Sequence, residues 1–184
     1  MPLVATLDTN VLYPMPLADT LLRLADRGLF QPVWSDVILA ELERTMIRLG
    51  RTVEQAHYRR SRMESAFPAS CRRFVFMLAS VPVQVQQQDR HVVAVAMASR
   101  SEVIVTDNLR HFAVAELLAL GIEVQDAETF LIHWLGQDQE SVIQVLGEQA
   151  AGLRDPTGIK ALLGAFPSMP RFSDAVRRLN AELE

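Results

Sequence analysis

Three polar residues follow directly after a short apolar run near the start of the chain. The run from Val4 to Leu7 is nearly continuous, as expected for a strand buried on both faces of an α/β sheet, and Asp8, Thr9 and Asn10 come next. Sites in such sheets lie beyond the carboxyl ends of the strands. Because hard cations bind carboxylate and amide oxygens, these side chains predict a divalent-cation site, with a turn or helix-capping Asp as the alternative.

Two further acids occupy comparable positions. The segment EVIVT at 102–106 is typical of a strand and is followed by Asp107, and Asp89 opens a segment whose core from 92 to 98 is apolar all round. Such a core is expected of a helix buried between the sheet and another layer. Carboxylates from two strand ends and one helix start would converge at one edge of the sheet, where a cation would relieve their repulsion.

A fourth acid belongs to a helix that we expect to begin at Ser35, its N-cap, and to end before Gly50. The apolar stripe of this helix passes through Leu42. Glu41 and Glu43 lie about 100° to either side of that stripe, so helix geometry does not choose between them.

The remaining pattern predicts the elements that position these acids. We expect helices over 17–25, 53–66, 69–80, 113–120 and 127–135, and strands over 30–34, 81–85 and 122–124. Alternation of this kind predicts an α/β fold with a parallel sheet and right-handed crossovers. From residue 137 onward the strand pattern disappears, which predicts a helical appendage.

The composition limits the class of protein. A chain of 184 residues with 49% apolar residues can bury a sizeable core. It has no run of eighteen uncharged apolar residues and no basic region before its first apolar run, so we expect a cytoplasmic protein with no membrane span and no signal peptide. Its one cysteine, Cys71, excludes an internal disulfide and a cysteine-built metal site.

The charge is distributed unevenly. Residues 44–73 hold eight arginines against only Glu54 and Glu64, which makes this segment +6 and the rest of the chain −10. Arginine suits phosphate, so a basic segment in an acidic chain indicates nucleic acid, with solvated helix faces or an acidic partner protein as alternatives. The candidates for contact with an RNA backbone are Arg59, Arg60 and Arg62.

Taken together, these motifs resemble the PIN-domain ribonucleases, the family of VapC-like toxins, over about residues 3–135. LDTNVL is similar to the opening motif of the family, WSDVILAEL to its glutamate segment, DRHVVAVA to its aspartate helix and VTDN to its last acidic motif. The resemblance selects Glu41 over Glu43. It implies four catalytic, metal-binding acids and three orienting polar groups: Asp8, Glu41, Asp89 and Asp107, with Asn10, Thr106 and Asn108.

The resemblance also implies a function. It is Mg²⁺- or Mn²⁺-dependent hydrolysis of RNA, in which cations held by the acids would activate a water and stabilise the leaving alkoxide, so that no protein nucleophile is needed. The implied fold is a three-layer PIN-like one, with a nuclease domain over 1–136 and a helical extension over 137–184. The implied partners are RNA, an antitoxin protein of a type II toxin-antitoxin system and a second copy of the chain in a homodimer.

Two other functions compete with this one. A Mg²⁺-dependent phosphoryl-transfer domain of the haloacid-dehalogenase or response-regulator kind also carries an Asp after its first strand. Here, however, Asn10 replaces the second Asp of the D-x-D motif, and the only lysine is Lys160 in the helical tail. The other competitor is a catalytically inactive PIN domain that binds RNA or protein, which the four retained acids disfavour. His91 and His111 are expected to cap or pack.

Overall fold

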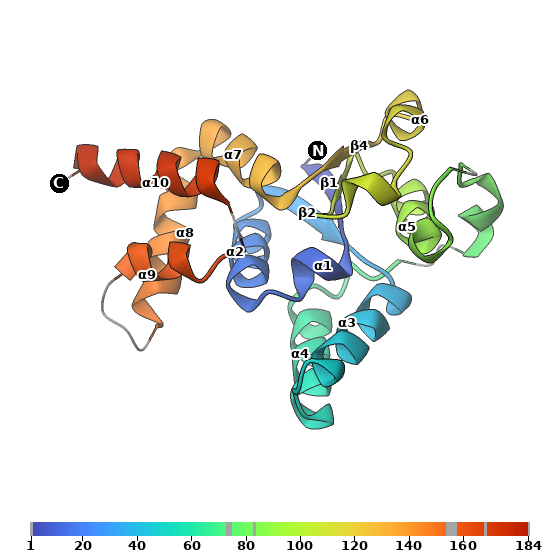
Figure 1. The fold of residues 1–184 in the computed structure, drawn as a ribbon, viewed down its shortest axis with the longest axis horizontal. Coiled ribbons are helices and arrows are strands. Elements are labelled where there is room, and N and C mark those ends of the chain that lie inside the picture. Colours follow the sequence, from blue (N-terminus) through green and yellow to red (C-terminus); the bar gives the residue numbers. More distant parts are fainter. Residues whose placement is uncertain (1, 73–74, 83, 154–157, 168, 184) are drawn as a thin grey trace. The chain divides into compact units, whose positions relative to one another are not determined.

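Strands and helices alternate along most of the chain, and helices alone form its end (Figure 1). The computed structural model describes residues 2–72, 75–82, 84–153, 158–167 and 169–183. The strands are β1 (Leu3–Leu7), β2 (Phe30–Val33), β3 (Val103–Val105) and β4 (Glu123–Gln125). The α-helices are α1 (Thr9–Leu12), α2 (Met15–Asp26), α3 (Asp36–Arg48), α4 (Val53–Ala66), α5 (Arg90–Ser99), α6 (Val114–Ala119), α7 (Ala127–Gln137), α8 (Gln139–Ala151), α9 (Gly158–Gly164) and α10 (Pro170–Leu183). The 3₁₀ helices are η1 (Val75–Ser80), η2 (Gln87–Asp89) and η3 (Leu109–His111).

The strands form one parallel sheet in the order β2-β1-β3-β4. In its register, Thr6 lies beside Val33 of β2, and Leu7 lies beside Val105 of β3. Because β1 has a neighbour on each side, it is a central strand, and the side chain of Leu7 is fully buried. The predicted α/β class with a parallel sheet is therefore confirmed, and β1 and β3 end side by side.

Helix α5 is buried against this sheet. Its residues Val92 to Ala96 are inaccessible to solvent, and the helix contacts β1, β2 and β3 as well as η1. A helix that is apolar on every side needs covering on more than one face, and here the sheet and η1 supply it. The expected buried helix after Asp89 is thus confirmed.

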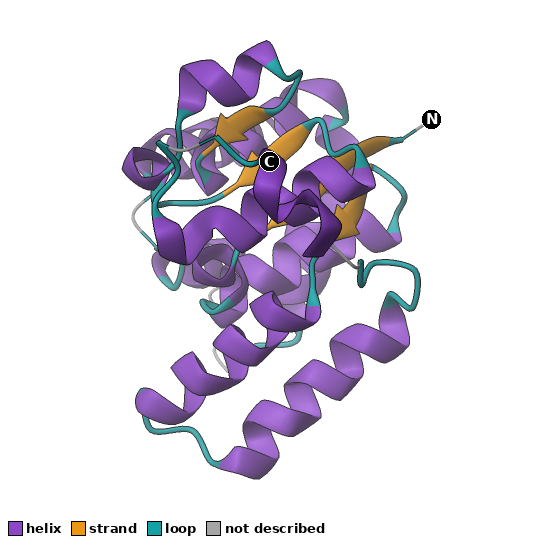
Figure 2. Cartoon of the chain, turned by 90° about the vertical axis from the view of Figure 1, so that its right-hand side faces the viewer, coloured by secondary structure: helices purple, strands orange, loops and turns teal. Residues whose placement is uncertain are grey.

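Helices α3 and α4 pack together as a helical hairpin (Figures 1 and 2). The Ser35 hydroxyl accepts the Ile38 N–H at 3.3 Å, which confirms the predicted N-cap of α3. Helix α4 begins with a capping box: Thr52 accepts the Gln55 N–H at 3.2 Å, and the Gln55 side chain accepts the Thr52 N–H at 3.1 Å. These local bonds satisfy backbone donors that a helix start leaves unpaired.

The predicted strand over 81–85 is wrong for the residues that the structure describes there. Val81 and Val85 are buried, but their backbones do not join the sheet. The carbonyls of Val81 and Pro82 each accept from the Arg90 guanidinium at 2.9 Å, and the Val85 N–H turns back to Pro82. Proline has no N–H to donate to a strand pairing.

The predicted helix over 69–80 is correct only at its end. Residues 75–80 form η1, whereas Ser70 and Arg72 bond to the Trp34 backbone, with N···O distances of 3.0 and 2.9 Å. The stretch around Cys71 therefore runs alongside the end of β2 as an isolated parallel bridge instead of forming a helix. Residues 73 and 74 lie outside the described residues.

By its contacts the chain divides into two compact units, residues 1–13 with 30–126, and residues 14–29 with 127–184. In the second unit the Thr20 hydroxyl of α2 donates to Gln149 Oε1 of α8 at 2.6 Å, and Gln149 donates to the Pro16 carbonyl at 2.8 Å. Helix α2 thus packs with the C-terminal helices. The predicted domain boundary after residue 136 falls inside α7 and stays a prediction. None of the described helices combines the length and the apolar character that crossing a membrane requires.

Candidate active site

Asp8 lies where β1 ends and α1 begins, and the residue is only 4% exposed. One carboxylate oxygen accepts the Thr9 N–H at 2.6 Å. The other accepts the Asn10 amide at 2.8 Å and the Thr106 hydroxyl at 2.7 Å. Asp8 is therefore the N-cap of α1, as the alternative interpretation held, and at the same time a buried acid at the carboxyl end of the central strand.

Asn10 connects the ends of β1 and β3. Its side-chain amide nitrogen donates to the Thr106 hydroxyl at 2.9 Å as well as to Asp8. Its side-chain oxygen Oδ1 accepts the Asp107 N–H at 3.0 Å. The Asn108 N–H donates to the Thr106 hydroxyl at 3.2 Å. All three predicted orienting residues thus lie at this edge, although Asn108 takes part through its backbone.

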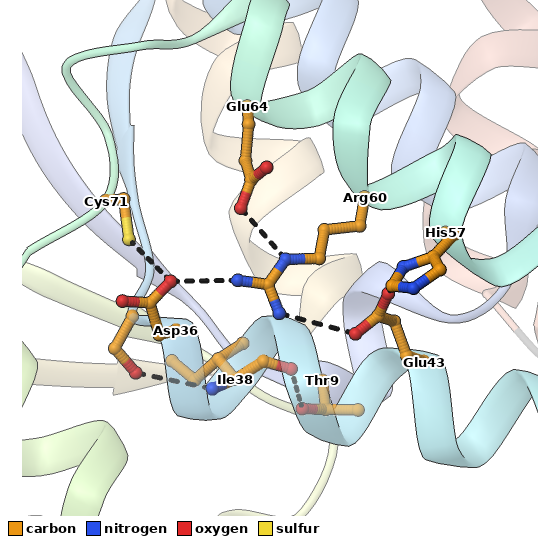
Figure 3. Close-up of polar contacts among 9 residues, drawn as sticks. Thr9, Asp36, Ile38, Glu43, His57, Arg60, Glu64 and Cys71 are labelled. Atoms are coloured by element: carbon orange, nitrogen blue, oxygen red, sulfur yellow. Dashed lines mark hydrogen bonds and ion pairs between the residues drawn. The ribbon is translucent and has the colours of Figure 1, made fainter.

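Glu41 faces the same edge from α3. Its carboxylate accepts the Thr9 hydroxyl at 3.2 Å and pairs with His91 Nε2 at 3.3 Å. Glu43 points elsewhere: it pairs with Arg60 at 3.3 Å and with His57 at 2.7 Å, on the α4 side of α3 (Figure 3). The two glutamates that periodicity could not separate are therefore separated by their neighbours.

Asp89 ends η2 just before α5 and is 8% exposed. Its carboxylate pairs with His111 Nδ1 at 3.1 Å. Asp107 lies two residues beyond the end of β3 and is exposed. Its backbone N–H donates to the side chain of Asn10. Thr9 thus connects Asp8 and Glu41, Asp89 acts on both through its charge, and Asp107 lies at the rim of the same edge.

The charges of these acids act on one another. Burial raises the pKa of Asp8, and the charge of Asp89 raises it further, so hydrogen bonds from Thr106 and Thr9 do not restore its usual value. Burial likewise raises the pKa of Asp89, because His111 opposes this only in part while the charge of Glu41 adds to it. Ionised carboxylates are therefore costly at this edge of the sheet.

His91 and Glu41 shift the pKa of one another. Burial lowers the pKa of His91, but its bond to Glu41 and the charges of Glu41 and Asp8 outweigh burial, and the net pKa is raised. Conversely, burial raises the pKa of Glu41, and the contact with His91 outweighs it, so the net pKa is lowered. His91 and His111 each pair with a predicted site acid, a role beyond the capping or packing expected from the sequence. Their only signal was proximity to Asp89 and Asp107.

Thr9 contacts two of the predicted acids, which its place beside Asp8 in the sequence did not show. Its N–H holds Asp8, and its hydroxyl contacts both Glu41 and the Ile38 carbonyl of α3, the latter at 3.3 Å (Figure 3). A single residue therefore connects the strand-end acid to the helix acid.

The donors at this edge suit a divalent cation in their chemistry. They are carboxylate and amide oxygens, and the charge of a bound cation would stabilise the ionised forms of Asp8 and Asp89, whose pKa values burial and repulsion raise. Within the described ranges, no three His, Cys, Asp or Glu side chains already stand together as a metal-binding group. The fit therefore rests on the chemistry of Asp8, Glu41 and Asp89.

The three arginines predicted to contact RNA differ in their surroundings. Arg59 donates to the carbonyls of Leu12 and Tyr13, which close α1. Arg60 lies among three carboxylates, at 2.9 Å from Asp36, 2.9 Å from Glu64 and 3.3 Å from Glu43 (Figure 3). Arg62 is exposed. A role in RNA binding stays a prediction for all three.

Known proteins resemble the part of the chain that carries this site. A model of the family described as "PIN domain" matches residues 5–110, which include all four predicted acids. The protein named "Putative ribonuclease VapC50" from Mycobacterium tuberculosis is 37% identical over 94 residues, which are 50% of this chain and 56% of that protein. The chain therefore spans about half the length of this curated relative. Comparison with solved structures gave no match.

Proposed function

The chain belongs to the PIN-domain family, and we propose that it hydrolyses RNA phosphodiester bonds with Mg²⁺ or Mn²⁺ held by Asp8, Glu41, Asp89 and Asp107. The observation that carries the proposal is that the first three acids lie at one edge of the sheet and are held there by neighbouring polar residues. A buried Asp8 at the end of the central strand is influenced by Asp89, and Glu41 reaches it through Thr9. Acids gathered at such cost are typical of functional sites.

The polar residues around the acids have distinct roles in this proposal. Three donors from Thr9, Asn10 and Thr106 fix both oxygens of Asp8, so the carboxylate is oriented before any ligand arrives. Thr9 and His91 hold Glu41, and His111 holds Asp89. A divalent ion bound there would supply Lewis acidity to the phosphate and lower the pKa of an attacking water.

The direct test is cleavage of total RNA by the purified protein, with Mn²⁺ or with EDTA, followed by mapping of the fragment ends. Loss of an outer partner of a metal ligand costs about 10–100-fold in activity, so Asp8→Asn and Asp89→Asn should each cost at least about 100-fold. Asp26→Asn removes the same charge from an exposed position in α2 and should change nothing.

Two results would reject the proposal. One is cleavage that persists in EDTA or survives both substitutions. The other is RNA binding without cleavage at any Mn²⁺ concentration, which would identify the chain as an inactive PIN domain that serves as a binding module.

We further propose that this nuclease is the toxin of a type II toxin-antitoxin system and acts on RNA in the cytoplasm as a homodimer. The resemblance to VapC-like toxins supports this assignment. Induced expression of the wild type should arrest bacterial growth, whereas Asp8→Asn should not, and light scattering should give the mass of two chains. Normal growth at expression levels that cleave cellular RNA would count against a toxin.

A further inference from the structure

Two arginines of the basic segment lie on the same face of α3 as Glu41. Arg44 and Arg48 follow Glu41 by three and seven residues, spacings that place side chains along one stripe of a helix. At a rise of 1.5 Å per residue, they lie about 4.5 and about 10.5 Å beyond Glu41 along the helix axis. Both side chains are exposed. The stripe therefore leads from the candidate active site onto open surface.

The inner member of this pair, Arg44, lies about one turn of α3 beyond Glu41. Glu43, the other acid in this part of α3, is turned toward α4 and pairs with Arg60. Beyond Glu41, the stripe thus carries positive charge only.

Two other arginines of the basic segment are already engaged by the protein. Arg60 directs its guanidinium to the three carboxylates in Figure 3, and Arg59 donates to two backbone carbonyls. By contrast, the described part of the chain contains no ion pair and no side-chain hydrogen bond of Arg44 or Arg48. Their donors are available to a ligand.

We propose that Arg44 and Arg48 form a track for a single RNA strand leaving the active site, with each guanidinium contacting one backbone phosphate beside the cleaved bond. The inference rests on the proposed ribonuclease function. The planar guanidinium suits phosphate oxygens, and the two residues are about 6 Å apart along the helix, close to the separation of consecutive phosphates in a single strand. Phosphate contacts carry no base information, so the track positions the strand without selecting its sequence.

The test compares two double variants that remove the same charge. Arg44→Gln with Arg48→Gln removes the track, whereas Arg100→Gln with Arg178→Gln removes two exposed arginines from the end of α5 and from α10. Fluorescence anisotropy in EDTA, with an unstructured labelled RNA, gives Kd over a range of salt concentrations. Each phosphate contact on a single strand contributes about 0.7 to the slope of log Kd against log salt, so the track variant should lose about 1.4 and the control nothing.

Turnover supplies a second readout, with thermal melts to show that both variants fold. With Mn²⁺ the track variant should raise KM and leave kcat within about twofold, because removing binding that is equal in ground and transition states acts on KM. An RNA too short to place two phosphates beyond the cleaved bond should be cleaved equally well by the wild type and by the track variant.

The inference and the underlying function fail in different ways. Absence of cleavage by the wild type rejects the nuclease, and the salt slope is still measurable without catalysis. Equal slope losses in both double variants, or no loss in the track variant, overturn the track. So does a track variant that binds RNA normally but no longer binds a protein partner.

Discussion

Replacing Asp8 by Asn removes one negative charge and one hydrogen-bond acceptor from the candidate active site. The two Asp8 oxygens accept three donors at 2.6, 2.7 and 2.8 Å. An amide keeps one accepting oxygen and presents an NH₂ group in place of the other. If the oxygen stays with the Thr9 N–H, that NH₂ faces the Asn10 amide nitrogen, and a buried donor without an acceptor costs about 1–3 kcal/mol.

An electrostatic gain opposes this loss. Since burial and the charge of Asp89 raise the pKa of Asp8 above its ordinary value of 3.8, the folded wild type binds this proton more tightly than the unfolded chain does. Its stability therefore falls as pH rises from the ordinary pKa to the raised folded pKa, whereas the Asn variant has no such dependence at this position. In the metal-free protein, the melting temperature of Asp8→Asn relative to wild type should rise between pH 4 and pH 8.

A swap of the two neighbours separates geometry from ligand chemistry. Asp8→Asn combined with Asn10→Asp keeps the net charge and provides an acceptor opposite the new NH₂ group. We expect this double variant to recover the hydrogen-bonding loss of about 1–3 kcal/mol, yet not the cleavage that depends on a carboxylate at position 8.

Thermal melts without Mn²⁺ measure the change in stability of the metal-free protein, and melts with Mn²⁺ measure the change in metal binding. At a hundredfold excess over its Kd, a ligand stabilises the folded state by about 2.7 kcal/mol, which corresponds to roughly 5–10 °C for a chain of this length. Wild type should show this shift, and Asp8→Asn should not. A melting-temperature difference that does not change with pH would refute the electrostatic reasoning. Full cleavage and an unchanged Mn²⁺ shift in Asp8→Asn would refute the assignment of Asp8.

Three further substitutions test contacts outside the acids. Arg59→Met removes two charged hydrogen bonds to the carbonyls closing α1, and urea unfolding should show a loss of about 1.5–3 kcal/mol. Thr20→Val removes the hydroxyl that donates to buried Gln149 at 2.6 Å, so the urea midpoint should fall by the equivalent of about 1–3 kcal/mol. An unchanged midpoint would contradict a stabilising role of this contact. Ser35→Ala removes the cap on the Ile38 N–H, costs about 1 kcal/mol and should speed hydrogen exchange in the first turn of α3.

Elements whose signals are local could be predicted from the sequence alone. The apolar run before Asp8 predicted the central strand, and the capping residue Ser35 predicted the start of α3, because caps and continuous apolar runs act over a few residues. The residues predicted for α4, 53–66, agree with the structure. The order of the acidic motifs was enough to indicate the family.

Local signals were insufficient where a distant side chain made the decision. Val81 and Val85 favour a strand, yet Arg90 takes the carbonyls that strand pairing would use. Helix α2, which follows α1 in the sequence, packs with α8 through Thr20 and Gln149.

Tertiary structure also decided which acidic and which arginine side chains are available to a ligand. Periodicity treated Glu41 and Glu43 alike, but Arg60 of α4 draws Glu43 to one side of α3 while Thr9 meets Glu41 on the other. Composition showed a basic segment without showing which arginines the protein itself uses. Folding brings carboxylates and carbonyls from elsewhere in the chain to Arg59 and Arg60, and residue spacing does not show these partners. Arg44 and Arg48 remain exposed on the face of α3 that carries Glu41.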